Sequence, residues 1–191
     1  MKKLLIINGH DEFERAKGQL TNYMFDVIRD NCNNHFEIKE TNIIAGYNIE
    51  EEIEKFQWAD NVLIQTPIYW FSIPGIVKKY IDDVFVPDIF FTKAKEFGRG
   101  GLFTQKKYML SVSWGASIRA FNANRESFLE GYSEDQLLFP IYKLFEYCGF
   151  KRLPTFSIYS AMKNPSLKEY ASQFQKHLRR HIIEGCESNA L

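Results

Sequence analysis

The stretch NVLIQTPIYWFSIPGIVKKYIDDVF, residues 61–85, decides the fold because it joins a strand, a turn and a helix. Residues 61–66 contain a short apolar run of the length of a buried strand, and residues 75–85 have apolar positions at helical spacing. Three consecutive aromatic residues, 69–71, lie between two prolines, where a chain normally turns through solvent. The stretch therefore predicts one unit of an α/β protein whose turn carries unusual planar, apolar surface.

The same alternation of strand and helix extends along the rest of the chain. Four further segments are predicted as strands: residues 3–8, 36–41, 107–113 and 155–160. Further helices are expected to begin near residue 18 and to cover residues 50–59, 133–148 and 166–183. Their start signals are Asn48 followed by Glu51, Ser133 followed by Gln136, and Ser166 followed by Glu169.

Five strands interleaved with helices predict a parallel sheet with helices on both faces, which is a three-layer α/β sandwich. Right-handed crossovers leave few topologies, and the flavodoxin-like strand order 2-1-3-4-5 is the preferred one. The 191 residues contain no repeat or linker, so residues 1–191 are expected to form a single domain. Ligands bind beyond the carboxyl ends of such strands, which directs attention to the loops after strands one, three and four.

Composition excludes several classes of protein. The 24 basic and 24 acidic side chains give zero net charge, so neither a nucleic-acid surface nor an acidic electron carrier is indicated. No apolar run reaches the length of a membrane span, and the apolar run in the first residues is shorter than a signal peptide requires. The scattered Cys32, Cys148 and Cys186 are expected to be reduced thiols in the cytoplasm.

The first loop, residues 9–20, has neither a G-x-G-x-x-G nor a Walker A pattern. Gly18 stands at the expected helix start after the basic Arg15 and Lys17, and free N–H groups at a helix start bind phosphate. A solvated loop with incidental charges is the alternative interpretation. His10 is interpreted as a packing or hydrogen-bonding residue rather than a catalytic one.

The loops after strands three and four carry aromatic rings at the same end of the sheet. Consecutive side chains in an extended turn cannot all point to one interior, so at least one ring of residues 69–71 is expected to reach the crevice. A platform for a flat ligand and an interface patch both fit this turn. In the other loop, Gly115 and Ala116 permit close backbone approach, while Ser113 offers a hydroxyl and Trp114 another ring.

Other candidate sites are weaker. His177 and His181 have a possible metal-ligand spacing but basic neighbours, so a solvated helix face is predicted and no metal is assigned. No Ser-His-Asp or Cys-His arrangement and no catalytic pair of carboxylates is recognised. The irregular, Phe-rich residues 90–105 are suited to a lid or a subunit contact.

Several motifs together carry a family resemblance that spans nearly the whole chain in one order. They are LIING at residues 5–9, F…GQL at 13–20, FQWAD at 56–60, KKYIDDVF at 78–85, FGRGGL at 97–102, KKYMLSVSW at 106–114 and LPTF at 153–156. KKYIDDVF and KKYMLS are together quite specific. On these motifs the chain resembles the modulator of drug activity B group of NAD(P)H:quinone oxidoreductases, within the flavodoxin-like quinone reductases.

The resemblance implies an FAD-bound homodimer that passes two electrons from NADPH or NADH through flavin N5 to a quinone in a ping-pong cycle. The flavin ring would rest against residues 69–71 and 113–116, and the pyrophosphate would meet residues 17–20. The chemistry belongs to the flavin, so no catalytic residue is assigned, with Tyr69 as one candidate proton donor. By motif position the FAD contacts would be Ala16, Lys17, Gly18, Gln19, Leu20, Thr21, Asn22, Tyr23, Ile68, Tyr69, Trp70, Phe71, Phe97, Ser113, Trp114, Gly115 and Ala116.

This chain also departs from the family pattern, and two other functions stay open. Ala16 replaces a frequent hydroxyl residue, Gly115 a frequent Asn, and Ile68 begins a turn that usually reads Gly-Trp-Trp-Met-Gly. The segment after Val86 is shorter than usual. These departures predict a difference in acceptor specificity. An FMN electron carrier of flavodoxin type and a flavin-dependent redox regulator without steady turnover are the alternatives.

Overall fold

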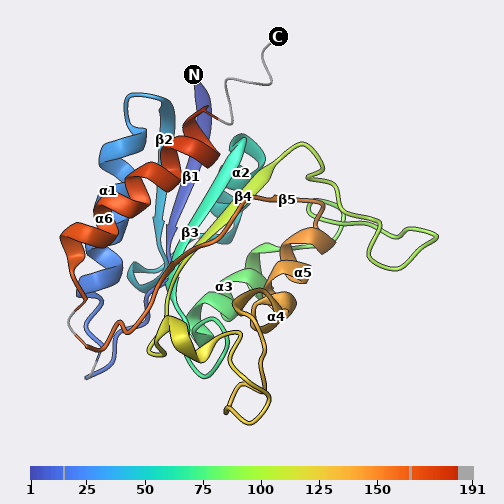
Figure 1. Ribbon diagram of the computed structural model, residues 1–191. Coiled ribbons are helices and arrows are strands. Elements are labelled where there is room, and N and C mark those ends of the chain that lie inside the picture. Colours follow the sequence, from blue (N-terminus) through green and yellow to red (C-terminus); the bar gives the residue numbers. More distant parts are fainter. Residues whose placement is uncertain (15, 164, 185–191) are drawn as a thin grey trace.

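The computed structural model describes residues 1–14, 16–163 and 165–184. Arg15 and Cys186, which were named above, lie outside the described residues. The strands form a parallel sheet in the order β2-β1-β3-β4-β5, with β6 also paired to β4, so the predicted order 2-1-3-4-5 is confirmed with one strand added (Figure 1). The strands are β1 (Lys2–Asn8), β2 (Phe36–Asn42), β3 (Asn61–Pro67), β4 (Lys107–Ser113), β5 (Lys151–Arg152) and β6 (Phe156–Ile158).

The helices cover both faces of the sheet, as expected (Figure 1). One face carries α1 (Gln19–Cys32) and α6 (Leu167–Leu178), which continues into a π-helical turn over Arg179–Ile183. The other face carries α2 (Ile49–Trp58), α3 (Gly75–Val84), α4 (Glu134–Leu137) and α5 (Phe139–Tyr147). Single 3₁₀ turns occur at Ile43–Ala45 and Ile118–Ala120. None of the helices within the described ranges is long and apolar enough to cross a membrane.

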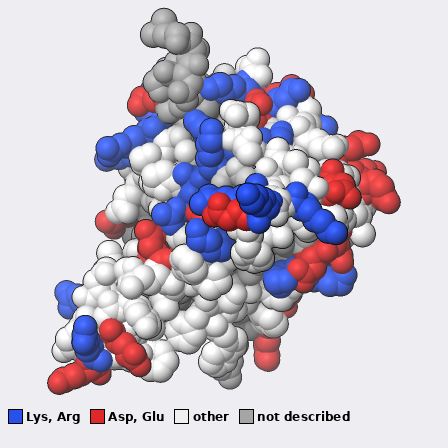
Figure 2. Space-filling model, turned by 90° about the vertical axis from the view of Figure 1, so that its right-hand side faces the viewer, with Lys and Arg blue, Asp and Glu red and all other residues white. Residues whose placement is uncertain are grey.

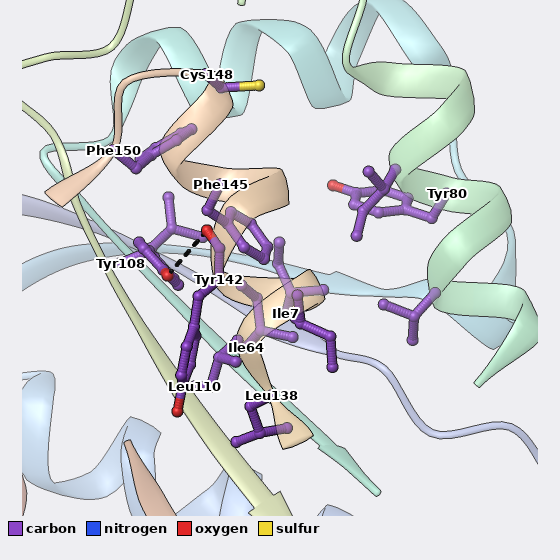
Figure 3. Close-up of a cluster of buried hydrophobic side chains, with 14 of the residues drawn as sticks. Ile7, Ile64, Tyr80, Tyr108, Leu110, Leu138, Tyr142, Phe145, Cys148 and Phe150 are labelled. Atoms are coloured by element: carbon purple, nitrogen blue, oxygen red, sulfur yellow. Dashed lines mark hydrogen bonds between the residues drawn. The ribbon is translucent and has the colours of Figure 1, made fainter. Parts of the chain in front are cut away.

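Alternate side chains of the buried strands supply two separate cores. Leu4 and Ile6 pack in the cluster under α1 and α6, whereas Leu5 and Ile7 pack in the cluster under α2, α3 and α5. This alternation is what a strand buried on both faces requires. In the larger cluster, rings from β4 and α5 face each other, and the ring of Tyr108 stacks on Phe145 at a centroid distance of 4.5 Å (Figure 3).

Two of the three predicted helix start signals are confirmed, whereas the third and two element boundaries need correction. Asn48 accepts from the Glu51 N–H at 3.0 Å, and Ser133 forms the expected capping box with Gln136, but the Ser166 side chain makes no capping hydrogen bond. The helix predicted over residues 133–148 breaks at Leu138, because Pro140 lacks an N–H and fits only the first turn of a new helix. The strand predicted over residues 155–160 is the shorter β6, and the unpredicted β5 precedes it on the other side of Pro154.

Candidate functional site

A cleft of about 1000 Å³ opens beyond the carboxyl ends of β1, β3 and β4. This is the end of the sheet where the strand order reverses between β1 and β3, so the fold alone predicts a ligand site here. The cleft is lined by residues from four loops: His10, Phe13, Ala16, Lys17, Gly18, Gln19, Leu20, Thr21, Pro67, Ile68, Tyr69, Trp70, Ile73, Pro74, Gly75, Ser113, Gly115, Ala161 and Met162.

The start of α1 forms one wall of this cleft. Gly18 is the residue before the helix, has a left-handed backbone with φ of 73°, and no side chain caps the helix. The first-turn residues Gln19, Leu20 and Thr21 line the cleft, so the N–H groups that a helix start leaves without intrahelical partners lie at this wall. With Lys17 beside them, they form a site suited to an anionic group such as a phosphate.

His10 lies behind the same wall and is 6% exposed. Its backbone N–H donates to the Asn8 side chain at 3.1 Å, but neither ring nitrogen has a hydrogen-bond partner among the described residues. Burial lowers the pKa of His10, which the Ala16 backbone and the carboxylates of Asp11 and Glu12 oppose only in part. His10 thus places a neutral ring, with two buried nitrogens that lack a partner among the described residues, directly behind the cleft wall.

The aromatic turn forms the opposite wall and has an unusual backbone. Tyr69 and Ser72 exchange backbone hydrogen bonds at 2.8 and 3.0 Å, which closes a two-residue hairpin. Its central residues, Trp70 and Phe71, have φ values of 50° and 66°. This left-handed pair is the geometry of a type I′ turn, which strongly prefers Asn-Gly over bulky residues. The turn thus stores strain beside the cleft, as functional loops often do.

The three rings of the turn point in different directions. Tyr69 lines the cleft, packs edge-on against Phe13 at 5.4 Å between centroids, and places its hydroxyl 3.4 Å from the Asp11 carbonyl oxygen. Trp70 also lines the cleft and is 93% exposed. Phe71 instead lies outside the cleft lining, 5.8 Å from the ring of Phe128. Two of the three rings therefore offer planar surface to a ligand.

The turn after β4 contributes backbone rather than rings to the cleft. Ser113 and Gly115 line it, and a β-carbon on Gly115 would meet no atom within 4 Å. Trp114 is buried, with its ring 5.0 Å from that of Phe121 and its indole N–H donating to Glu134 at 2.8 Å. The expected role of this turn in close backbone approach fits the geometry, whereas the Trp114 ring lies in the core.

Four further sequence candidates lie outside the cleft lining. Asn22 accepts a hydrogen bond from Asn8 at 2.7 Å, and Tyr23 packs against the core under α1. Ala116 packs against the other core. Phe97 is 92% exposed in the segment between α3 and β4, which projects from the body of the molecule (Figure 1). Within one chain, Phe97 therefore does not line the cleft.

Sequence reasoning missed the fourth loop, which supplies Ala161 and Met162. The loop follows β6, whose register on β4 places Ile158 opposite Ser113 and so brings the next residues to the cleft. The available signal was its position after the fifth predicted strand. Phe13, Ile73 and Pro74 were also missed, although they flank segments that had been identified.

His177 in α6 and His181 in the turn that follows are the pair with a possible metal-ligand spacing. No group of three or more His, Cys, Asp or Glu side chains with ligand geometry occurs in the part of the chain that the structure describes. The His177 ring nitrogen lies 2.9 Å from the Pro154 carbonyl oxygen, and the His177 and His181 rings are 4.5 Å apart. The pair is thus engaged in local packing.

The sheet order and the position of the cleft define a protein of flavodoxin-like fold, and a family model described as flavodoxin-like fold matches residues 2–181. The NADPH:quinone oxidoreductase MdaB of Haemophilus influenzae is 35% identical over 189 residues, covering 93% of this chain and 97% of that protein. An uncharacterized protein of Schizosaccharomyces pombe is 30% identical and covers 92% of this chain and 95% of its own. The chain belongs to the MdaB family of flavodoxin-like NAD(P)H:quinone oxidoreductases.

Solved structures agree at the level of the fold. The general stress protein 14 of Treponema denticola, in complex with FMN, superposes with a TM-score of 0.72 at 21% identity, covering 93% of this chain and 98% of that one. At this identity the likeness establishes the fold only.

Proposed function

We propose that this protein is a flavin-dependent NAD(P)H:quinone oxidoreductase that uses FAD. The observation that carries the proposal is the cleft itself, with the start of α1 on one wall and the rings of Tyr69 and Trp70 on the other. A flavin nucleotide has the matching pair of features, an anionic phosphate portion and a planar ring. The relationship to MdaB, named an NADPH:quinone oxidoreductase, supports the same activity.

The residues present fit an FAD group. Gln19, Leu20 and Thr21 bring helix-start N–H groups to the wall, and Lys17 adds a positive charge, which suits the pyrophosphate. The opposite wall offers planar surface, and Gly115 allows close approach of backbone to the ring's polar edge. The cleft volume of about 1000 Å³ is at the upper end for small-molecule sites, which favours a dinucleotide over the smaller FMN.

Bound flavin would supply the redox chemistry by accepting two electrons with a proton from NADPH or NADH and passing them to a quinone in a second half-reaction. The protein residues bind and orient the two flat partners in turn. Burial raises the pKa of Tyr69, an effect that the nearby Asp11 carboxylate reinforces, so its hydroxyl stays protonated at neutral pH. Tyr69 could thereby exchange its long hydrogen bond to the Asp11 carbonyl, 3.4 Å, for one to a ligand in the cleft.

We further propose that the enzyme acts as a cytoplasmic homodimer. Phe97 and Phe128 are 92% and 84% exposed, and contact with a second copy would remove this apolar surface from water. The face toward which the segment between α3 and β4 projects has charges of both signs above a broad uncharged area (Figure 2). This mixture suits contact with a second copy better than contact with a polyanion. Cys32 and Cys148 are buried and free, as suits a reducing compartment.

The test is to purify the protein, denature it and identify any released flavin, then to assay NADPH and NADH oxidation with a menadione-like quinone. We expect a yellow protein that releases FAD and turns over steadily. Release of FMN would identify FMN rather than FAD as the cofactor. Bound flavin without turnover would favour an electron carrier or a redox regulator. A colourless protein that takes up neither flavin contradicts the proposal. Size-exclusion chromatography with light scattering tests the dimer.

A further inference from the structure

The Glu134 carboxylate, at the first residue of α4, is a meeting point for three side chains outside its own helix. Oε1 accepts from the Trp114 indole N–H at 2.8 Å and from the Ser157 hydroxyl, and Oε2 accepts from the Tyr159 hydroxyl at 2.7 Å. Burial raises the pKa of Tyr159, and its hydrogen bond to Glu134 adds to the effect, so the tyrosine remains a donor. Three hydrogen bonds to one charged acceptor hold the Glu134 carboxylate firmly in place.

The three donors belong to two segments that form one wall of the cleft. Trp114 lies in the turn after β4, between the cleft residues Ser113 and Gly115. Ser157 and Tyr159 lie in and just after β6, ahead of the cleft residues Ala161 and Met162. Glu134, Trp114, Ser157 and Tyr159 do not line the cleft, so Glu134 holds the two segments from outside the cleft lining.

Backbone hydrogen bonds also join the two segments. The Trp114 N–H donates to the Ile158 carbonyl at 2.7 Å, the Ala161 N–H to the Trp114 carbonyl at 2.9 Å, and the Ser160 N–H to the Ala116 carbonyl at 2.8 Å. Ser160 has φ of 55°, so this chain path is not one that the segment adopts by default. A side-chain anchor that holds Trp114 and Tyr159 together favours the path.

We propose that Glu134 is a positioning residue that preforms the cleft wall made by Gly115, Ala161 and Met162. The inference rests on the proposed flavin function, because that wall would face the flavin ring. A preformed wall binds its ligand without the cost of ordering two loops. Without the carboxylate, the Trp114 N–H and the Ser157 and Tyr159 hydroxyls lose their shared partner, and only the backbone hydrogen bonds then hold the two segments together.

The chain offers an isosteric variant and a matched control. In Glu134→Gln the amide oxygen can still accept from Trp114 and Ser157, and the amide N–H can donate to the Tyr159 oxygen, so the anchor survives without charge. In Glu134→Ala the anchor is lost. Asp135→Ala removes a carboxylate from the same helix, one that accepts from Tyr142 at 2.9 Å rather than from the cleft segments.

The experiment measures two properties of the four proteins. FAD affinity is measured by fluorescence titration of the apoprotein, and hydrogen exchange of the Trp114 indole N–H and the Ala161 amide is measured by NMR without flavin. We expect Glu134→Ala to weaken FAD binding about tenfold and to speed both exchanges about tenfold. Glu134→Gln and Asp135→Ala should stay near the wild type in both measurements.

Wild-type FAD affinity and exchange in Glu134→Ala would overturn the inference, as would equal losses in Asp135→Ala. If Glu134→Gln changes FAD affinity and hydrogen exchange as much as Glu134→Ala does, the effect comes from the negative charge and not from positioning, and the inference is wrong. If the wild-type protein binds no flavin, the proposed function fails, whereas the exchange data still decide whether Glu134 orders this wall.

Discussion

The imidazole of His10 occupies the space that a β-carbon at Gly18 would need. Such a carbon would lie 2.4 Å from His10 Cδ2 and 2.8 Å from His10 Nε2, which no real contact permits. Gly18 also has φ of 73°, a backbone conformation that residues other than glycine adopt only at a cost in free energy. The packing of His10 and the start of α1 are therefore coupled, and both lie in the wall expected to meet the phosphate portion of a flavin.

Gly18→Ala should destabilise the protein by about 2–4 kcal/mol, because left-handed strain and overpacking add. The His10 ring must also move, so FAD affinity should fall. Gly75→Ala is the control, since Gly75 lines the same cleft but a β-carbon there meets no atom within 4 Å. Urea unfolding and FAD titration of both variants check this. Wild-type stability in Gly18→Ala would contradict the coupling.

The strained turn at Trp70 and Phe71 predicts a conflict between stability and ligand binding. The double variant Trp70→Asn, Phe71→Gly gives the residues that a type I′ turn prefers. It should raise the free energy of unfolding by about 1 kcal/mol while weakening FAD binding, because the Trp70 ring leaves the cleft. Thermal unfolding and FAD titration measure the two effects.

A single variant separates the strain from the ring. Phe71→Gly relieves the strain at φ of 66° but removes a ring that packs on Phe128 rather than in the cleft. We expect it to keep near wild-type FAD affinity. A loss of affinity as large as that of the double variant would show that the Trp70 ring is not the ligand-facing element.

The strands and the site's location were predictable because they depend on local pattern and on chirality. Apolar runs gave β1, β3 and β4 nearly to the residue, and right-handed crossovers then placed their carboxyl ends together. The two-residue β5 was not predictable, because Lys151 and Arg152 are exposed and carry no strand pattern. β5 pairs with β4 because it lies beside it at the edge of the sheet, and not because of its own side chains.

The directions of the side chains within the site could not be predicted from the sequence. Trp114 and Trp70 both follow strands, yet one is buried and the other is 93% exposed. The difference has one distant cause and one local cause: the Trp114 indole N–H donates to Glu134, whereas the left-handed hairpin of residues 69–72 turns Trp70 outward. Neither the contact with Glu134 nor the left-handed turn is marked by spacing along the chain, so the loops could be identified but not the rings that face a ligand.

A buried network away from the cleft should affect stability without affecting ligand binding. Glu52, in α2, is 2% exposed and accepts hydrogen bonds from the Tyr80 hydroxyl at 2.6 Å and the Thr41 hydroxyl at 2.7 Å. Tyr80→Phe removes one bond to this charged group and should cost about 1.5–3 kcal/mol. Urea unfolding measures the loss, and FAD affinity of the folded variant should be unchanged.

Tyr47→Phe serves as the control for that network. Its hydroxyl donates to Asp83 at 2.7 Å, but Asp83 lies at the surface and also pairs with Lys79, so the loss should be smaller. Equal losses in the two tyrosine variants would mean that burial of Glu52 does not set the strength of its bond. A change in FAD affinity for Tyr80→Phe would mean that the network reaches the cleft.

Burial lowers the pKa of three histidines, His10, His177 and His181, and this sets the direction of the response to acid. Each folded-state pKa lies below the unfolded value near 6.5, so the unfolded chain binds more protons as the pH falls. The stability that the neutral rings contribute is complete above about pH 6.5 and is lost as the pH falls through the folded-state values. We therefore expect the free energy of unfolding, measured by urea at several pH values, to decrease from about pH 7 to pH 5.5. The double variant His177→Gln, His181→Gln should show a smaller decrease, and a wild-type stability that is constant or rises toward acid would contradict the assignment.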